Sequence, residues 1–161
     1  MKLPSAEWRR VAQVRTSKRG RFRFKALRGP SRLLRFRYPG TATIRARARQ
    51  VDLRVRAVTS LRVTQKRVVN GEEIRFGGRL KGRQTGETGK LIHLQVYTRG
   101  RWSTFAAPRA NRESGAWRVP YRFTATRGRV RYRFRALVPR ETSFPYETGV
   151  SRSVQVTVQG L

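Results

Sequence analysis

Apolar and cationic side chains alternate strictly along residues 129–136, where the sequence reads RVRYRFRA. A period of two is that of a β-strand, whose successive side chains point to opposite faces. A helix of this sequence would instead carry arginine and aromatic rings on every side. The stretch therefore predicts a strand with one apolar face in a core and one row of arginines in water. The expected inward residues are Val130, Tyr132, Phe134 and Ala136, and the expected outward residues are Arg129, Arg131, Arg133 and Arg135.

The same alternation continues through the second part of the chain, from about residue 58, between regularly spaced turn signals. Pairs such as Asn70-Gly71 and Arg99-Gly100 mark the turns, because glycine readily adopts the positive φ that a tight turn requires. No segment shows the 3.6-residue period of an amphipathic helix. Seven short strands with such turns predict a β-sandwich. The expected strands are 59–64, 73–80, 91–98, 102–107, 117–124, 129–138 and 151–158.

Residues 8–57 show a similar alternation in shorter pieces, separated by turns that contain glycine or proline. Arginine or lysine occupies the other face of most of the strands expected here. Those strands are 8–14 (a weak one), 21–27, 33–38, 43–49 and 51–57. The expected inward residues are Phe22, Phe24, Ala26, Leu34, Phe36, Tyr38, Ile44, Ala46, Ala48, Val51, Leu53, Val55 and Ala57.

The chain contains an internal repeat. LRFRY at 34–38 matches YRFRA at 132–136, and VDLRV at 51–55 matches VQVTV at 154–158. By this match the first unit corresponds only to the last four strands of the second.

The repeat divides the chain into a partial unit at residues 1–57 and a complete seven-stranded sandwich at residues 58–161. Four strands leave much of an apolar face uncovered, so the first unit is expected to pair with the second unit or with a further segment. We expect the chain to be the C-terminal end of a longer tandem array.

The charge of the chain is extreme, with 39 Lys and Arg against 8 Asp and Glu and a net charge of +31. Such a surface attracts polyanions of any kind and repels itself. Of the 39 cations 33 are arginine, a skew that a high-GC genome also produces through its codon usage. A functional basic surface and biased codon usage both remain open as explanations.

Groups that could carry chemistry are scarce. Cysteine is absent, which excludes disulfides, thiolate metal sites and cysteine nucleophiles. His93 is the only histidine and Asp52 the only aspartate, and the adjacent Glu72 and Glu73 would point to opposite faces of a strand. The segment Gly86–Lys90 departs from the phosphate-binding loop pattern and is followed by a strand. We therefore expect no enzyme activity, metal or cofactor.

The aromatic residues of the second unit have two interpretations, as a sandwich core or as stacking platforms for bases or sugars. Most of them share a face with inward aliphatic residues, which favours the core. Trp102 is the least certain, because it lies beside the turn at 99–101. The residues concerned are Trp102, Trp117, Tyr121, Phe123, Tyr132 and Phe134.

The outward arginines are the one functional signal in the pattern. If strand 129–138 lies between 91–98 and 151–158, its arginines share a face with His93, Gln95, Tyr97, Gln155 and Thr157. Arginines at alternate strand positions are about 6.5–7 Å apart, close to the spacing of phosphates along a nucleic-acid strand. The sequence has no base-reading motif, so binding would rest on counterion release. The candidate polyanion-binding residues are Arg131, Arg133, Arg135, Arg118, Arg122, Arg35 and Arg37.

Three short motifs of residues 58–161 resemble immunoglobulin-like (Ig-like) and fibronectin-III-like repeats of bacterial surface proteins. They are GRW at 100–102, SGAW at 114–117 and VRYRFRA at 130–136, where Tyr132 takes the tyrosine-corner position. The Cys…Trp…Cys signature of antibody-type domains is absent, which weighs against that subclass. The resemblance extends in part to residues 8–57. It implies an all-β, Ig-like antiparallel β-sandwich, with one complete domain preceded by a partial second one.

Proteins of this family usually serve as exported spacers or adhesion modules without catalytic residues. The resemblance thus implies a structural or adhesion module at the cell surface or outside the cell. Its partners would be neighbouring Ig-like repeats of a longer chain and, through the basic charge, anionic cell-wall polymer or nucleic acid. The alternative is a dedicated nucleic-acid-binding protein of the cytoplasm. The start, MKLPSAEWRR, lacks a signal-peptide core, and no run approaches the roughly 20 apolar residues that span a bilayer, so no membrane insertion is expected.

Overall fold

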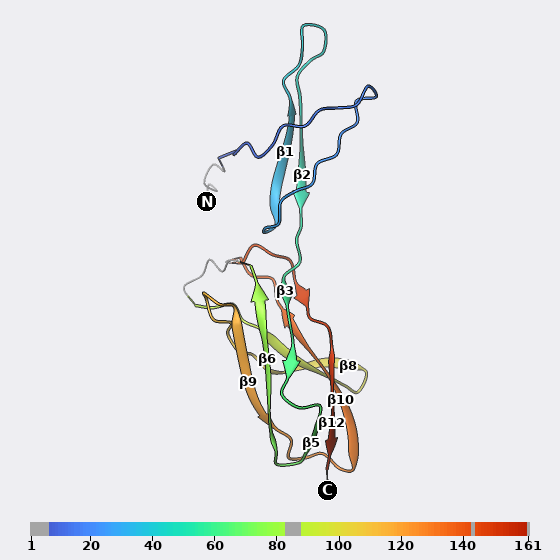
Figure 1. The fold of residues 1–161 in the computed structure, drawn as a ribbon, viewed down its shortest axis with the longest axis vertical. Coiled ribbons are helices and arrows are strands. Elements are labelled where there is room, and N and C mark those ends of the chain that lie inside the picture. The colour runs from blue at the N-terminus through green and yellow to red at the C-terminus, as the bar shows by residue number, and fades with distance from the viewer. Residues whose placement is uncertain (1–6, 83–87, 143, 161) are drawn as a thin grey trace.

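All regular structure in the described part of the chain is β-strand, which confirms the all-β prediction (Figure 1). The computed structural model describes residues 7–82, 88–142 and 144–160. Its strands form a six-stranded sheet, a four-stranded sheet and a separate two-stranded sheet. Within these ranges no helix offers the length and apolar character needed to cross a membrane.

The larger sheet has the strand order β5-β12-β10-β7-β8, with β11 also paired to β10. Neighbouring strands are antiparallel except β5 and β12, which run parallel. The longest strand, β10, is central and pairs with β7 on one side and β12 on the other, which is the order expected if the second unit is a sandwich of this kind. The strand bounds are β5 (Arg67–Val69), β7 (His93–Thr98), β8 (Arg101–Ala106), β10 (Arg129–Val138), β11 (Gly149–Val150) and β12 (Val154–Gln159).

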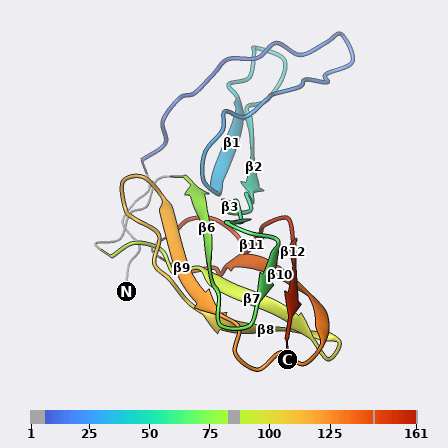
Figure 2. The same ribbon diagram turned by 60° about the horizontal axis from the view of Figure 1, so that its bottom comes forward.

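The smaller sheet is built around β6, which pairs antiparallel with β3, β4 and β9. In Figure 2, β6 and β9 lie side by side and cross over the larger sheet, an arrangement consistent with a β-sandwich. The bounds are β3 (Val58–Thr59), β4 (Arg62–Val63), β6 (Glu73–Lys81) and β9 (Ala116–Arg122).

The core lies between the two sheets and is rich in aromatic rings. Phe76 of β6 and Phe134 of β10 are buried, and their ring centroids are 4.8 Å apart. Phe105 of β8 packs within 5.7 Å of both rings. Burying each such side chain contributes on the order of 1.5–3 kcal/mol to folding. The other fully buried side chains of the strands include Ile74, Leu94, Ala136, Val138, Val156 and Val158.

Tyr132 joins this core with its ring and reaches a polar partner with its hydroxyl. The ring stacks on Phe123 at a centroid distance of 5.6 Å, and the hydroxyl oxygen lies 3.3 Å from the Thr126 hydroxyl. The half-buried Tyr132 therefore lies on the inward face of β10, together with Phe134.

The strand predictions for the second unit need several corrections. The expected strand 59–64 is divided into the short strands β3 and β4, and the expected strand 151–158 begins later, as β12. The short strands β5 and β11 were not predicted. Two or three residues are too few for a recognisable period of two, so the alternation could not reveal them.

The first unit forms only a hairpin, made of β1 (Arg32–Tyr38) and β2 (Arg47–Leu53). The prediction of strands at 8–14 and 21–27 is wrong, because both segments are irregular. The two strands expected at 43–49 and 51–57 are replaced by the single strand β2. In the described ranges no third strand pairs with β1 or β2. The segment before β1 is therefore not part of a sheet with the hairpin.

Residues 7–56 contain no buried residue, so the side chains expected to point inward are not enclosed here. Phe22 and Phe24 contact Phe36 of β1 at centroid distances of 5.1 and 5.8 Å, but Phe22 remains 43% exposed and Tyr38 40% exposed. A single hairpin has no second layer to close over such side chains. Among the other expected inward residues, Ile44 and Val51 are also exposed.

Backbone hydrogen bonds attach the base of the hairpin to the sandwich. The Ser31 amide donates to the Pro145 carbonyl at 2.8 Å, and the Ala57 amide donates to the Glu147 carbonyl at 2.9 Å. The Glu147 amide in turn donates to the Val55 carbonyl at 2.8 Å. The hairpin therefore projects from the end of the sandwich where β3 begins, beside the loop that joins β10 to β11 (Figure 1).

Candidate polyanion-binding face

The outer face of the larger sheet carries a row of arginines that could bind an anion. Strand alternation places these residues on the side away from the core, because their neighbours in sequence are the buried residues of the same strands. We name this surface the basic face. It comprises Arg67 of β5, Gln155 and Thr157 of β12, Arg129, Arg131, Arg133 and Arg135 of β10, Gln95 and Tyr97 of β7, and Trp102 and Thr104 of β8.

The strand register brings residues of three strands together at the centre of this face. Arg133 lies opposite Tyr97 on one side and Gln155 on the other, and Arg135 lies opposite Gln95. The shared face expected from the sequence for Arg133, Arg135 and these neighbours is thus present.

Two arginines of β10 stack on aromatic rings of β7 and β8. The guanidinium carbon of Arg133 lies 4.4 Å from the Tyr97 ring centroid and 5.3 Å from that of Trp102. The guanidinium carbon of Arg135 lies 4.2 Å from the Trp102 centroid. The two rings also contact each other, at 5.2 Å. Each cation–π contact contributes roughly 0.5–1 kcal/mol at an exposed site, so the four side chains hold one another in place.

A chain of side-chain hydrogen bonds fixes Arg135 further. Its Nε donates to Gln95 Oε1 at 2.8 Å, and Gln95 Nε2 donates to Thr104 Oγ1 at 3.1 Å. Partial burial lowers the pKa of Arg135 below its ordinary value by desolvation, but an arginine remains cationic at neutral pH. Arg135 is therefore an oriented, permanent positive charge.

The end of the face nearest the β7–β8 turn carries further cations. Arg131 lies opposite Thr157, which in turn lies opposite Arg67. Continuing the β7–β10 register by two residues brings Arg99, in the turn, level with Arg131. Arg99 has a φ of +50°, and Gly100 follows with +75°, the backbone of a tight hairpin turn. This turn therefore places an additional arginine at the same end of the sheet as Arg131.

The carboxylates of the described residues that form ion pairs lie away from the basic face. None of the arginines on this face has a carboxylate within ion-pair distance in the described ranges, so their charges are not neutralised from within the chain. The observed pairs are Asp52 with Arg54, Glu73 with Arg75 and Arg122, Glu141 with Lys90, and Glu147 with Arg140.

The seven arginines expected from the sequence do not form one site. Arg118 and Arg122 lie on β9, on the outer face of the other sheet, where Arg122 pairs with Glu73 at 3.7 Å. Arg35 and Arg37 lie on β1 of the hairpin, and Arg35 stacks on Trp8 at 4.2 Å. Of these seven arginines, Arg131, Arg133 and Arg135 lie on the basic face.

Sequence reasoning placed Tyr97 on this face but did not decide between the core and the outer side for Trp102. Along RWSTFA, residues 101–106, Trp102 and Phe105 have opposite strand parity, so the pattern supports either face as the core side. In the structure Phe105 packs against Phe76, and Trp102 lies outside against Arg135. The cation–π contacts of Trp102 with arginines of another strand place it on the outer face, and the sequence alone does not show these contacts.

The described ranges contain no group of three or more His, Cys, Asp or Glu residues placed to hold a metal ion. His93 is half-buried and lies opposite Leu137 on the outer side of the sheet. Lys90 is buried and forms an ion pair with Glu141 at 2.6 Å, which removes it from a phosphate-binding role. The remainder of the loop pattern, Gly86 and Glu87, lies outside the described residues.

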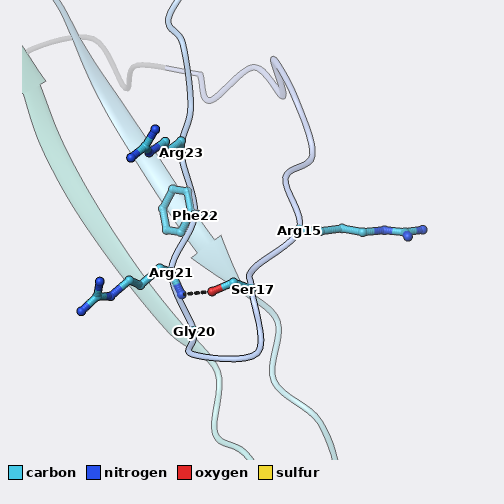
Figure 3. Close-up of a pocket in the computed structure, with 6 residues that line it drawn as sticks. All are labelled: Arg15, Ser17, Gly20, Arg21, Phe22 and Arg23. Carbon is cyan, nitrogen blue, oxygen red and sulfur yellow. Dashed lines mark hydrogen bonds between the residues drawn. The ribbon is translucent and has the colours of Figure 1, made fainter.

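A surface hollow in the irregular segment before the hairpin offers no second candidate site. In Figure 3 the Arg21 amide donates to Ser17 Oγ, at 3.2 Å, and Arg15 points away from the other side chains. All of the lining residues are exposed, so the hollow cannot remove a small ligand from water. They are Arg15, Ser17, Gly20, Arg21, Phe22 and Arg23.

No protein-family model matches this sequence. A search of curated proteins likewise finds no significant match. A function must therefore be argued from the residues and the fold.

Proposed function

We propose that this chain is a non-enzymatic, Ig-like structural module of an exported bacterial protein, and that its basic face binds polyanions. The strand order supports the Ig-like part of the proposal, since β10 lies between β7 and β12 and the short strand β5 runs parallel to β12. The short sequence motifs of the second unit point to the same family. Export rests on that resemblance.

One observation carries the binding function: the arginine row of β10 lies on an open sheet face without a neutralising carboxylate among the described residues. Keeping like charges this close is unfavourable in the free protein, so a multivalent anion that neutralises them gains affinity. Each neutralised phosphate or sulfate also releases condensed counterions. A polyanion is therefore a better partner for this face than a neutral ligand or a basic protein.

The proposal assigns no catalytic residue and no cofactor. The described carboxylates that form ion pairs have arginine or lysine as their partners, and an acid/base pair or a metal cluster is not assembled in these ranges. The basic face itself holds amides, hydroxyls, aromatic rings and guanidinium groups, which suit binding rather than proton transfer.

The proposal includes neighbouring repeats as partners of the hairpin. By the internal repeat β1 corresponds to β10 and β2 to β12, yet β10 also pairs with β7, whereas β1 pairs only with β2 among the described strands. Residues 7–56 expose apolar side chains and bury none completely. The remaining strands of another repeat would cover the face that carries Leu34 and Phe36. Reading the gene upstream of the Met1 codon tests this: further copies and a signal peptide are expected, and an in-frame stop immediately upstream would contradict it.

A dedicated nucleic-acid-binding protein is the second candidate, and the spacing of the arginines favours it. Alternate residues of β10 are about 6.5–7 Å apart, comparable to neighbouring phosphates of an extended strand. A dedicated binder should keep submicromolar affinity near physiological salt and prefer one form of nucleic acid. A structural module should lose affinity steeply with salt and bind different polyanions alike.

The test is a salt titration of binding to double-stranded DNA, single-stranded DNA and heparin. We expect measurable binding at low salt, a linear fall of log K with log salt, and a shallower slope for the double variant Arg131→Gln/Arg133→Gln. The matched control is Arg118→Gln/Arg122→Gln, which removes the same charge from the opposite face. Equal effects of the two double variants would show that net charge, rather than the basic face, governs binding.

A further inference from the structure

We infer that the basic face binds the backbone of an extended polyphosphodiester, with Arg133 and Arg135 as oriented anion clamps, and that its aromatic rings do not stack on bases or sugars. This inference rests on the proposed polyanion binding and specifies the ligand class and its mode of contact. Trp102 and Tyr97 act as positioning residues for the two guanidinium groups.

The first step is that each ring already stacks on a guanidinium group. A protein that stacks bases presents open aromatic faces to a single strand. Here the Arg133 and Arg135 guanidinium carbons lie 4.4 and 4.2 Å from the Tyr97 and Trp102 centroids, which is stacking distance. A base that stacked on the same face of either ring would have to displace an arginine, and it would lose both that contact and the charge. Stacking of a ligand on these faces is therefore disfavoured.

The second step is that a stacked guanidinium keeps its hydrogen-bond donors. The donors lie in the plane of the group, so covering its flat face with a ring leaves the N–H edges available to bind a phosphate in a two-pronged manner. In Arg135 the Nε donor is used by Gln95, which leaves the terminal nitrogens for a ligand. Both arginines are ordered before a ligand arrives, so binding loses less side-chain freedom than it would with mobile arginines.

The third step is the path of the cations across the sheet. Arg131, Arg133 and Arg135 follow β10 at a spacing of about 6.5–7 Å. Near the Arg131 end of this row lie Arg99, in the β7–β8 turn, and Arg67 of β5, which is separated from Arg131 by Thr157 of β12. A chain with one negative charge per repeat of similar length can contact successive arginines along β10. Nucleic acid and polyol-phosphate wall polymer share this chemistry.

The experiment compares three probes of matched charge number at several salt concentrations: oligo(dT) of about 15 nucleotides, an abasic oligomer of the same length, and poly(glycerol phosphate). Affinities within about threefold of each other at matched salt are expected, because the bases contribute no stacking. An abasic oligomer that binds tenfold more weakly than oligo(dT) would overturn the backbone mode. Weak binding of poly(glycerol phosphate) alone would overturn the general polyphosphodiester class and assign the site to nucleic acid.

Two variants separate positioning from charge. Arg133→Gln should reduce the salt slope for single strands by about 0.7, the value for one lost phosphate contact. Trp102→Leu should weaken binding of all three probes about three- to tenfold with an unchanged slope, because the number of cations stays the same. Matching circular dichroism spectra and melting temperatures confirm that the variants are folded. A Trp102→Leu variant that binds like the wild type would overturn the positioning role.

The outcome also separates this inference from the proposed function. If no probe binds at low salt, or if Arg118→Gln/Arg122→Gln weakens binding as much as Arg133→Gln/Arg135→Gln, the proposed function fails and the inference fails with it. If binding follows the basic face but depends on bases, polyanion binding stands and only the backbone mode is wrong.

Discussion

The indole N–H of Trp117 donates a hydrogen bond of 3.2 Å to the hydroxyl oxygen of Thr59, within the core and across 58 positions of sequence. The bond links β9 to β3, which otherwise meet only through β6. Gly78 of β6 leaves the space for the indole, since a Cβ there would lie 2.7 Å from the Trp117 ring and 2.0 Å from the Ser60 carbonyl oxygen. A large aromatic residue is thus buried without leaving its polar atom unsatisfied.

Trp117→Phe should lower the free energy of unfolding by about 1–3 kcal/mol, because it removes buried ring volume and the bond to Thr59. Urea denaturation measures the loss. A double-mutant cycle with Thr59→Val should show a coupling of about 0.5–1.5 kcal/mol between the two side chains. Simple additivity would mean that the hydrogen bond contributes nothing to stability.

Gly78→Ala should destabilise the protein by about 1–3 kcal/mol, since the new methyl group meets both a backbone oxygen and the Trp117 ring. Gly77→Ala is the matched control, because a Cβ there comes no closer than 3.3 Å to another atom. Thermal unfolding of the two variants checks the difference. Equal melting temperatures would refute the tight packing at Gly78.

Phe134→Ala should cost roughly 3–5 kcal/mol and unfold the sandwich under mild conditions, because Phe134 is 2% exposed and contacts Phe76 and Phe105. Arg133→Gln is the control from the other face of the same strand. It should leave stability nearly unchanged, since the lost cation–π contacts and the relieved repulsion oppose each other. A melting temperature of the Phe134 variant within a degree or two of wild type would show that its core placement is wrong.

Arg99→Asn should raise stability by about 0.5–1 kcal/mol, because a side chain with a Cβ is strained at a φ of +50° and asparagine tolerates this conformation best. Arg101→Asn, at the start of β8, removes the same charge and serves as the control. If both variants gain equally in a denaturation experiment, charge relief rather than turn geometry is the cause.

Replacing Lys90 and replacing Glu141 should lower the free energy of unfolding by different amounts, because the two residues of this ion pair differ in burial. The Lys90 side chain is 2% exposed and that of Glu141 is 39% exposed. Glu141→Gln removes a negative charge that compensates the buried Lys90 ammonium group. Lys90→Met instead leaves the Glu141 carboxylate, which water can reach. We expect the Glu141 variant to lose about 1–2 kcal/mol more than the Lys90 variant in urea denaturation. The reverse order would contradict the burial of the lysine.

Strand periodicity predicted the strands of the sandwich well where the alternation is long. The bounds of β10 agree residue for residue with the expected strand 129–138, because its alternation is long and a core lies on one face only. The arginine face of β10 followed directly from that pattern. In contrast, residues 21–27 alternate as well as β10 does but are irregular, since alternation specifies a face and cannot supply a partner strand.

Sequence reasoning could predict the arginines of the basic face but not the contacts that orient them. The positions of Arg131, Arg133 and Arg135 follow from strand parity, whereas the stacking of Arg135 on Trp102 depends on the register between β10, β7 and β8. That register includes an irregularity between Leu94 and Gln95, which a single sequence does not reveal. Arg118 and Arg122 have the same local pattern as the β10 arginines, and only the topology separates the two faces.

The parallel pairing of β5 with β12 has a mechanical consequence. The chain enters β5 at its N-terminal end and leaves β12 at its C-terminal end, and in a parallel pair these ends lie at opposite extremities. A tensile force applied at the start of β5 and the end of β12 would shear the β5–β12 hydrogen bonds along the strand axis and strain them together rather than in succession. The pairing of the short strand β5 with β12 would then resist mechanical unfolding of the sandwich.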